Sequence, residues 1–156
     1  MQDTEFMELA LEQARLAARH GDVPVGAVIV KDGAVIAAAG NRREQDKDAT
    51  AHAELLAIRQ ACQVLGGWRL SGCTLYVTLE PCPMCTGAII NARLDRVVYG
   101  LADEKAGCCG SVACIPDMPL NHRPIITRGI LSEACGMVLK EFFERKRPGR
   151  TKCDCE

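Results

Sequence analysis

The chain has 156 residues, of which 48% are apolar and 25% charged, an ordinary composition for one soluble globular domain. Its net charge of −1 argues against a broadly basic nucleic-acid binder, and no run approaches the roughly 18 apolar residues of a membrane span. The N-terminus carries acids where a signal peptide would carry bases, so we expect a cytoplasmic protein. In that compartment, ten cysteines favour metal binding or chemistry over disulfides.

Hydrophobic periodicity and turn residues divide the chain into helices and strands. In chain order they predict a helix over 4–20 ended by Gly21, strands over 25–30 and 34–39, a helix from about Ala51 to Leu65, a strand over 73–79, a helix starting near Pro83, strands over 96–100 and 125–127, and a last helix from Ser132. The pair Asp32-Gly33 predicts a tight hairpin between the first two strands. A polar loop over 41–50 precedes the second helix, with Thr50 as a plausible cap.

This order of elements predicts an α/β fold with three layers, in which a central mixed sheet of about five strands has helices on both faces. We expect a single domain over residues 1–150 and a disordered tail over 151–156. Residues 100–124 show no clean period and are rich in Gly and Pro. A loop of this length in a compact domain is usually functional or disordered.

The stretch "EPCPMC" places Cys82 and Cys85 at the start of a predicted helix. Free N–H groups and the helix dipole favour thiolate over thiol at that position, and Pro83 needs no hydrogen-bond donor in a first turn. Two thiolates at this spacing suit a zinc ion, which usually takes four Cys or His ligands. Alone, however, a C-x-x-C pair is a weak signal that also fits a redox couple or chance.

The stretch "TAHAE" places His52 and Glu54 at the start of another predicted helix. If the two helix starts face each other, His52 becomes a third ligand and Glu54 stands beside the open position without filling it. Three ligands and an adjacent unbound acid form an arrangement for activating water. The combination of H-x-E with P-C-x-x-C is the signature of the zinc deaminases and is far more specific than either part.

Two other interpretations of the cysteines stay open. A closed structural zinc site needs a fourth ligand, which Cys73, Cys108 or Cys109 could supply. A redox role would leave the prolines and the H-x-E motif without an explanation.

Beyond the zinc motifs, the sequence contains "VPVGAV", "GNR", "WRL", "TLYVTLEPCPMC", "RVVYG", "NHR" and "FFERKR". With these motifs the chain resembles the cytidine/deoxycytidylate deaminase superfamily and, within it, the bacterial tRNA-specific adenosine deaminases, from about Phe6 to Arg147. The resemblance implies a cytidine-deaminase-like fold, one zinc per subunit and a homodimer that acts on the tRNA anticodon loop. The expected reaction converts adenosine to inosine at the wobble position, with an arginine tRNA carrying an ACG anticodon as the expected substrate.

The resemblance also implies roles for the residues of the base pocket. His52, Cys82 and Cys85 hold zinc, and Glu54 moves protons from water to the adenine. The remaining pocket residues are Val25, which lines the base, Asn41, which hydrogen-bonds the purine edge, and Ala53 and Pro81, whose backbone contacts the group at C6.

Further residues are expected to contact RNA by the same resemblance. They are Asp103, Lys105, Asn121, His122 and Arg123 at the entrance, and Phe142, Arg145, Lys146 and Arg147 on the last helix. Residues 140–152 hold six bases against two acids, which also fits a solvated last helix. From the residues alone, Phe142 and Phe143 fit a core position better than a stacking role, and His122 could simply satisfy a loop backbone.

Two alternative functions remain. A deaminase of a free base or nucleoside, of the guanine or cytosine type, would use the same zinc chemistry. A non-catalytic zinc-stabilised RNA-binding module would have no use for an unliganded Glu54 beside the metal.

Overall fold

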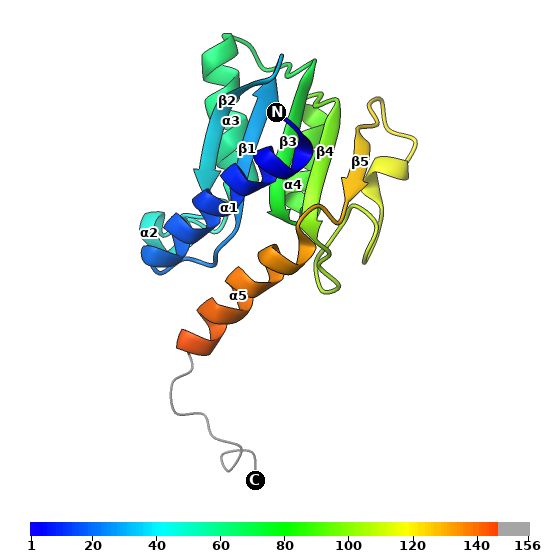
Figure 1. Cartoon of the computed structure of the whole chain (residues 1–156). Helices are drawn as coiled ribbons and strands as arrows, with labels where there is room; N and C mark the ends of the chain where they lie inside the picture. The colour runs from blue at the N-terminus through cyan, green and yellow to red at the C-terminus, as the bar shows by residue number, and fades with distance from the viewer. Residues whose placement is uncertain (147–156) are drawn as a thin grey trace.

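The computed structural model describes residues 1–146 and shows one five-stranded mixed sheet with the strand order β2-β1-β3-β4-β5 (Figure 1). The strands are β1 (Gly26–Lys31), β2 (Ala34–Gly40), β3 (Cys73–Leu79), β4 (Arg96–Leu101) and β5 (Ile125–Arg128). β1 pairs antiparallel with both β2 and β3, whereas β3, β4 and β5 are parallel. The predicted mixed sheet of about five strands is confirmed.

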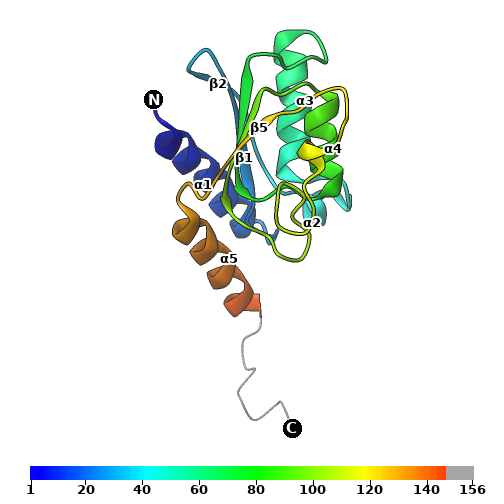
Figure 2. The same ribbon diagram turned by 90° about the vertical axis from the view of Figure 1, so that its right-hand side faces the viewer.

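Helices cover both faces of this sheet, as predicted (Figure 2). They are α1 (Asp3–Arg19), α2 (Arg43–Asp46), α3 (Ala53–Leu65), α4 (Pro83–Asn91) and α5 (Ser132–Lys146). α1 and α5 lie on one face, and α3 and α4 lie on the other. Because successive strand residues point to opposite faces, Ala27 and Ile29 of β1 join the core under α3 and α4, and Val28 and Val30 join the core under α1.

The hairpin between β1 and β2 turns as its sequence predicts. Asp32 and Gly33 have φ values of 51° and 77°, the left-handed pair that a two-residue turn of this type requires. Close packing of α1 on the sheet depends on another glycine, Gly26. A Cβ at Gly26 would lie 1.9 Å from the carbonyl oxygen of Ala10, so no larger residue fits there without a shift of α1.

Two details of the loop before α3 differ from the prediction. The short helix α2 lies within the predicted polar loop, and the carboxylate of the buried Asp22 accepts hydrogen bonds from the backbone N–H groups of Glu44 (2.9 Å) and Gln45 (3.4 Å). Thr50 is not the cap of α3, because its hydroxyl donates instead to Asp48 at 2.7 Å and the N-cap residue is His52. The second difference places a predicted ligand at the very start of the helix.

The second half of α5 projects past the end of the sheet (Figure 1). Cys135 is the only buried residue of the helix, and Phe143 is 44% exposed. The interpretation of Phe142 and Phe143 as core residues is therefore wrong, because the sheet does not extend beneath them. Phe142 is half-buried and packs edge-to-face on Phe143.

The predictions for Arg147 and for the tail over 151–156 lie outside the described residues. Within residues 1–146, no helix is long and apolar enough to cross a membrane.

Candidate active site

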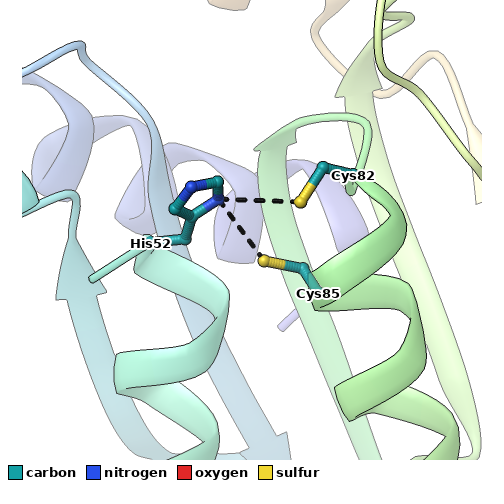
Figure 3. A group of neighbouring side chains, drawn as sticks. All are labelled: His52, Cys82 and Cys85. Carbon is teal, nitrogen blue, oxygen red and sulfur yellow. Dashed lines mark hydrogen bonds between the residues drawn. The ribbon is translucent and has the colours of Figure 1, made fainter. Parts of the chain in front are cut away.

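The starts of α3 and α4 lie side by side and bring three predicted ligands together (Figure 3). His52 is the N-cap residue of α3 and Cys82 is the N-cap residue of α4. Neither side chain makes a capping hydrogen bond, so both are available for another role. Cys85 follows Cys82 within the first turn of α4, and its sulfur points toward the same imidazole nitrogen.

The spacing of the three ligand atoms fits a tetrahedral metal ion. Nδ1 of His52 lies 3.7 Å from Sγ of Cys82 and 3.5 Å from Sγ of Cys85, and all three atoms lie within 4.8 Å of one another. With typical Zn–S and Zn–N bond lengths, the S···N edge of a tetrahedral zinc site is about 3.6 Å. The residues present therefore fit a metal ion without rearrangement.

The electrostatics of the cluster favour the form of cysteine that binds metal. A hydrogen bond from Cys85, helped by His52, lowers the pKa of Cys82 to about 4, while the same interaction raises the pKa of Cys85. The hydrogen bond with Cys82 in turn raises the pKa of His52. Cys82 is thus a thiolate at neutral pH, beside the positive ends of two helices.

Glu54 lies one residue beyond the first residue of α3 and is only 4% exposed. Burial raises the pKa of Glu54 to about 7, which is the range in which a carboxyl group exchanges protons efficiently near neutral pH. Glu54 is not one of the three clustered ligand residues. The cluster and this acid together can activate water and transfer its proton.

A closed four-ligand site is not supported by the described residues. Among residues 1–146, the metal-ligand cluster contains only His52, Cys82 and Cys85. Cys73, Cys108 and Cys109, the possible fourth ligands, lie outside it, although both Cys108 and Cys109 are buried. Three protein ligands leave a fourth position open, as in catalytic rather than structural zinc sites.

The cluster opens into a cavity of about 220 Å³. Of the residues predicted for the pocket, Val25, Asn41, His52, Glu54, Cys82 and Asp103 line it. Sequence reasoning missed five further lining residues, which are Val23, Arg43, Leu79, Glu80 and Ala106. Val23, Leu79 and Glu80 lie within the quoted motifs "VPVGAV" and "TLYVTLEPCPMC", and Arg43 directly follows "GNR", so position in or beside a recognised motif was the available signal for these four.

Ala53 and Pro81 do not line the cavity, and backbone groups of both are engaged within the protein. The N–H of Ala53 donates to Oδ1 of Asn41 at 2.8 Å, and the carbonyl of Pro81 accepts the N–H of Cys108 at 2.9 Å. Asn41 therefore holds the first residue of α3, while its Nδ2 makes no hydrogen bond among the described residues.

A loop over residues 102–111 closes one side of the cavity and is organised by Glu80. Glu80 is 2% exposed, and its carboxylate accepts the backbone N–H groups of Asp103 (3.1 Å), Cys109 (3.0 Å) and Ser111 (3.1 Å) as well as the Ser111 hydroxyl. The loop approaches so closely at Gly107 that a Cβ there would lie 2.4 Å from this carboxylate. Asp103 consequently faces the cavity, and Lys105 beside it is exposed.

Asn121, His122 and Arg123 lie at the opposite end of the sheet from the cluster. The imidazole of His122 contacts the carbonyl of Leu94, just before β4 begins, at 2.6 Å. The cluster follows the C-terminal end of β3, which runs parallel to β4. The prediction that this segment lines the entrance is therefore not met within one chain, since the length of the sheet separates the two.

Phe142, Arg145 and Lys146 line a groove between α1 and α5, together with two cations of α1, Arg15 and Arg19. The ammonium of Lys146 lies 5.6 Å from the centre of the Phe142 ring. None of the four cations takes part in a salt bridge within the described chain. The two helices that form this basic groove, α1 and α5, lie on the same face of the sheet (Figure 2).

Comparisons with known proteins agree with this geometry. Residues 1–147 match the family of MafB19-like deaminases. The tRNA-specific adenosine deaminase of Bacillus subtilis (strain 168) is 46% identical over 147 residues, which cover 94% of this chain and 91% of the relative. A solved structure from work on A-to-I editing by tRNA:A34 deaminases is 47% identical and superimposes with a TM-score of 0.83, covering 87% of this chain and 99% of that one.

The guanine deaminase of Bacillus subtilis is a more distant neighbour. Its solved structure is 36% identical and has a TM-score of 0.65, with 97% of this chain and 99% of that one covered. The layered architecture found here is thus the cytidine-deaminase-like fold that the sequence predicted. The chain belongs to the MafB19-like deaminases, and it is a deaminase.

Proposed function

We propose that this protein catalyses the zinc-dependent hydrolytic deamination of adenosine to inosine at the wobble position of tRNA, with release of ammonia. The expected substrate is an arginine tRNA with an ACG anticodon, and the expected location is the cytoplasm. The observation that carries the proposal is that the buried Glu54 lines one cavity with His52 and Cys82, two members of the cluster that Cys85 completes. Relatives named for tRNA adenosine deamination support the choice of substrate.

Zinc is the metal that suits this donor set, one ion per subunit. Thiolate and imidazole ligands favour zinc over hard ions such as magnesium. When bound by His52, Cys82 and Cys85, zinc supplies a Lewis acid that lowers the pKa of water.

Glu54 carries the proton transfers. Its carboxylate accepts a proton from the attacking water and delivers it to N1 of the adenine, while the water oxygen bonds to C6. Glu54 then takes the remaining proton from the oxygen now bonded to C6 and passes it to the departing amino group, so that adenosine and water yield inosine and ammonia. A pKa of about 7 lets one carboxyl group act as base and then as acid near neutral pH.

Asn41 and Val25 hold the purine. Because Oδ1 of Asn41 is taken by the N–H of Ala53, the amide presents its Nδ2 donor to the base, which suits an acceptor nitrogen of a purine. Val25 supplies an apolar wall of the cavity. The family resemblance also assigns the backbone of Ala53 and of Pro81 to the group at C6, although neither residue lines the cavity.

RNA reaches this pocket as an anticodon loop with its target base splayed out. Asp103 and Lys105 take the flanking nucleotides at the mouth of the cavity. We assign Asn121, His122 and Arg123 to RNA only through a homodimer in which two subunits share the substrate, because these residues lie far from the cavity of their own chain.

The last helix supplies the remaining RNA contacts in this proposal. Phe142 offers an aromatic surface, and Arg145, Lys146 and Arg147 offer positive charge to phosphates.

The test is an activity comparison on zinc-loaded protein. An ACG-anticodon tRNA, guanine, cytosine and cytidine are offered in parallel, with inosine determined by sequencing and ammonia by assay. We expect inosine at the wobble position and no ammonia from the free bases. Ammonia from guanine, with the tRNA unchanged, would retain the zinc and Glu54 chemistry but refute the RNA substrate.

Glu54→Ala is the matched control for that test. The variant should keep its zinc content and its circular dichroism spectrum, since Glu54 is not a ligand, and should lose turnover by several orders of magnitude. Substantial remaining activity would refute the proton-transfer role of Glu54.

A further inference from the structure

Arg43 is a cavity residue whose hydrogen-bonding capacity is unused. It lies in the first turn of α2 and lines the cavity that also contains His52 and Glu54. Its Nε is buried and has no hydrogen-bond partner, and it is the only side-chain nitrogen or oxygen within residues 1–146 in that condition. An N–H donor left buried without an acceptor is costly, so such a donor in a cavity indicates a ligand that supplies the acceptor.

The neighbouring residue, Arg42, differs from Arg43 because its guanidinium has a hydrogen-bond acceptor within the protein. Arg42 is exposed and donates three hydrogen bonds, from Nε and Nη2, to the carboxylate of Asp46 at 3.0 to 3.2 Å. It borders a different hollow, between α1, β2 and α3. Positive charge in this loop therefore does not by itself mark a binding residue. The distinguishing features of Arg43 are its position in the cavity and its unpaired donor.

We propose that Arg43 binds a phosphodiester group of the RNA strand next to the reacting nucleotide. A guanidinium carries only donors, in a planar fork that matches two phosphate oxygens. The cluster and Glu54 occupy the part of the cavity where the base must react, whereas Arg43 is only half-buried and reaches the solvent. The acceptors that a splayed nucleotide presents between base and solvent are its ribose and its phosphates.

Phosphate is preferred over a base acceptor because Arg43 has no acidic partner. No salt bridge involves Arg43 within the described chain, so its guanidinium is not directly paired with any of the three carboxylates of the cavity wall, which belong to Glu54, Glu80 and Asp103. An anion satisfies both the charge and the orphaned donor, whereas a neutral purine nitrogen satisfies only the donor. This inference rests on the proposed RNA substrate, since a free base carries no phosphate.

The experiment measures kcat/KM on an anticodon-stem hairpin in which the phosphate on the 5′ or the 3′ side of the target adenosine is replaced by a neutral methylphosphonate. With the wild-type enzyme, one of these replacements should lower kcat/KM about ten- to a hundredfold, the usual effect of losing a charged hydrogen bond. Arg43→Ala should lose a similar factor on the unmodified hairpin. It should then lose nothing further when the same phosphate is neutralised.

Arg42→Ala is the matched control, because it removes the same charge from the adjacent position. It should remain as sensitive to the neutral linkage as the wild type. Arg43→Lys keeps the charge but loses the fork, so it should retain an intermediate sensitivity if Arg43→Ala proves unstable. Zinc content and melting temperature are measured for every variant.

Three outcomes would overturn the contact. Independent losses from Arg43→Ala and from the neutral linkage would show that the two groups do not interact. Sensitivity to a purine analogue lacking N7, rather than to either linkage, would assign Arg43 to the base. A wild type that deaminates no RNA would refute the proposed function, and the phosphodiester contact with it, whereas the first two outcomes leave that function standing.

Discussion

Asn41 joins structure and chemistry in one side chain. Its Oδ1 accepts the first N–H of α3, and its Nδ2, which makes no hydrogen bond within the described chain, is the donor that the proposed function assigns to the substrate. Asn41→Asp keeps the acceptor for Ala53, and a carboxylate there is favourable at a helix start, but the variant loses the donor. We predict an unchanged melting temperature and a loss of at least about tenfold in kcat/KM for inosine formation.

Asn41→Ala separates the two functions. This variant removes the acceptor as well as the donor, so the free energy of unfolding should fall by the roughly 1 kcal/mol that a lost helix cap costs, and the melting temperature should fall with it. Equal activity of Asn41→Asp and the wild type would show that the Nδ2 donor has no part in substrate binding.

At the scale of single residues, the motifs predicted the site because their residues lie at helix starts. The spacing of His52 and Glu54 alone would not have predicted it. Two residues apart on a regular helix, His52 and Glu54 would point to different sides. His52 instead has extended backbone angles as the N-cap residue, and Glu54 lies in the first turn. Motif resemblance identified the pair. Arg43 was not predicted as a site residue, because no local sequence pattern shows that its Nε lacks a hydrogen-bond partner.

At the scale of elements, Glu80 links β3 to the loop over 102–111. Glu80→Gln replaces one carboxylate oxygen by an NH₂ group that must face backbone N–H donors. We predict a loss of about 1–3 kcal/mol in the free energy of unfolding and faster hydrogen exchange at the amides of Asp103 and Cys109.

Ser111→Ala is the control for that substitution. It removes the hydroxyl donor but leaves three backbone donors to Glu80, so exchange at Asp103 and Cys109 should change little. If Glu80→Gln left those amides as protected as in the wild type, Glu80 would not be what orders the loop.

This loop and α2 show why short segments were harder to predict than the strands and the long helices. The partners that order them are distant in sequence: Asp22 holds α2 from 22 residues away, and Glu80 reaches 31 residues ahead to Ser111. A prediction that considers only residues close in the sequence includes neither Asp22 nor Glu80. The strands and long helices needed only local periodicity, so they were predicted correctly.

One ion pair ties α1 to the sheet. Asp3 accepts hydrogen bonds from Arg96 of β4 at 2.7 and 2.9 Å and from the hydroxyl of Tyr76 of β3 at 2.7 Å. The hydrogen bond from Arg96 lowers the pKa of Asp3 from its ordinary value of 3.8. A carboxyl group with a lowered folded-state pKa stabilises the protein above its unfolded pKa, and this contribution is lost as the pH falls through the folded pKa.

Asp3→Asn should therefore reduce stability in a pH-dependent way. We predict a loss of about 1 kcal/mol at pH 7, modest because both side chains are about 30% exposed. The difference between variant and wild type should shrink as the pH falls below 3.8. Urea unfolding of both proteins from pH 7 to pH 3 measures it, and a difference that stays constant over this range would show that the charge of Asp3 contributes nothing.

At the scale of the whole molecule, charge is unevenly distributed although the net charge is only −1. The basic groove between α1 and α5 gathers Arg15, Arg19, Arg145 and Lys146 against the single acid Glu141. The sequence predicted Arg145 and Lys146 of α5 as RNA-binding cations. Arg15 and Arg19 join them in the groove only because α1 packs beside α5. α5 projects past the end of the sheet at which α2 lies (Figure 1), and Arg43 of α2 lines the cavity, so the proposed function places the RNA at this same end of the sheet.

Reversing the charges of Arg15 and Arg19 should therefore weaken tRNA binding as much as reversing those of Arg145 and Lys146. Each lost phosphate contact lowers the slope of log Kd against log salt concentration by about 0.7 to 0.9, so each double variant should flatten it by about 1.5. Arg69→Glu with Arg93→Glu, beside the exposed Trp68, is the matched control and should change neither affinity nor slope. A flattened slope for the α5 pair alone would restrict the RNA surface to the last helix, because a phosphate held in the groove must sense the cations of both walls.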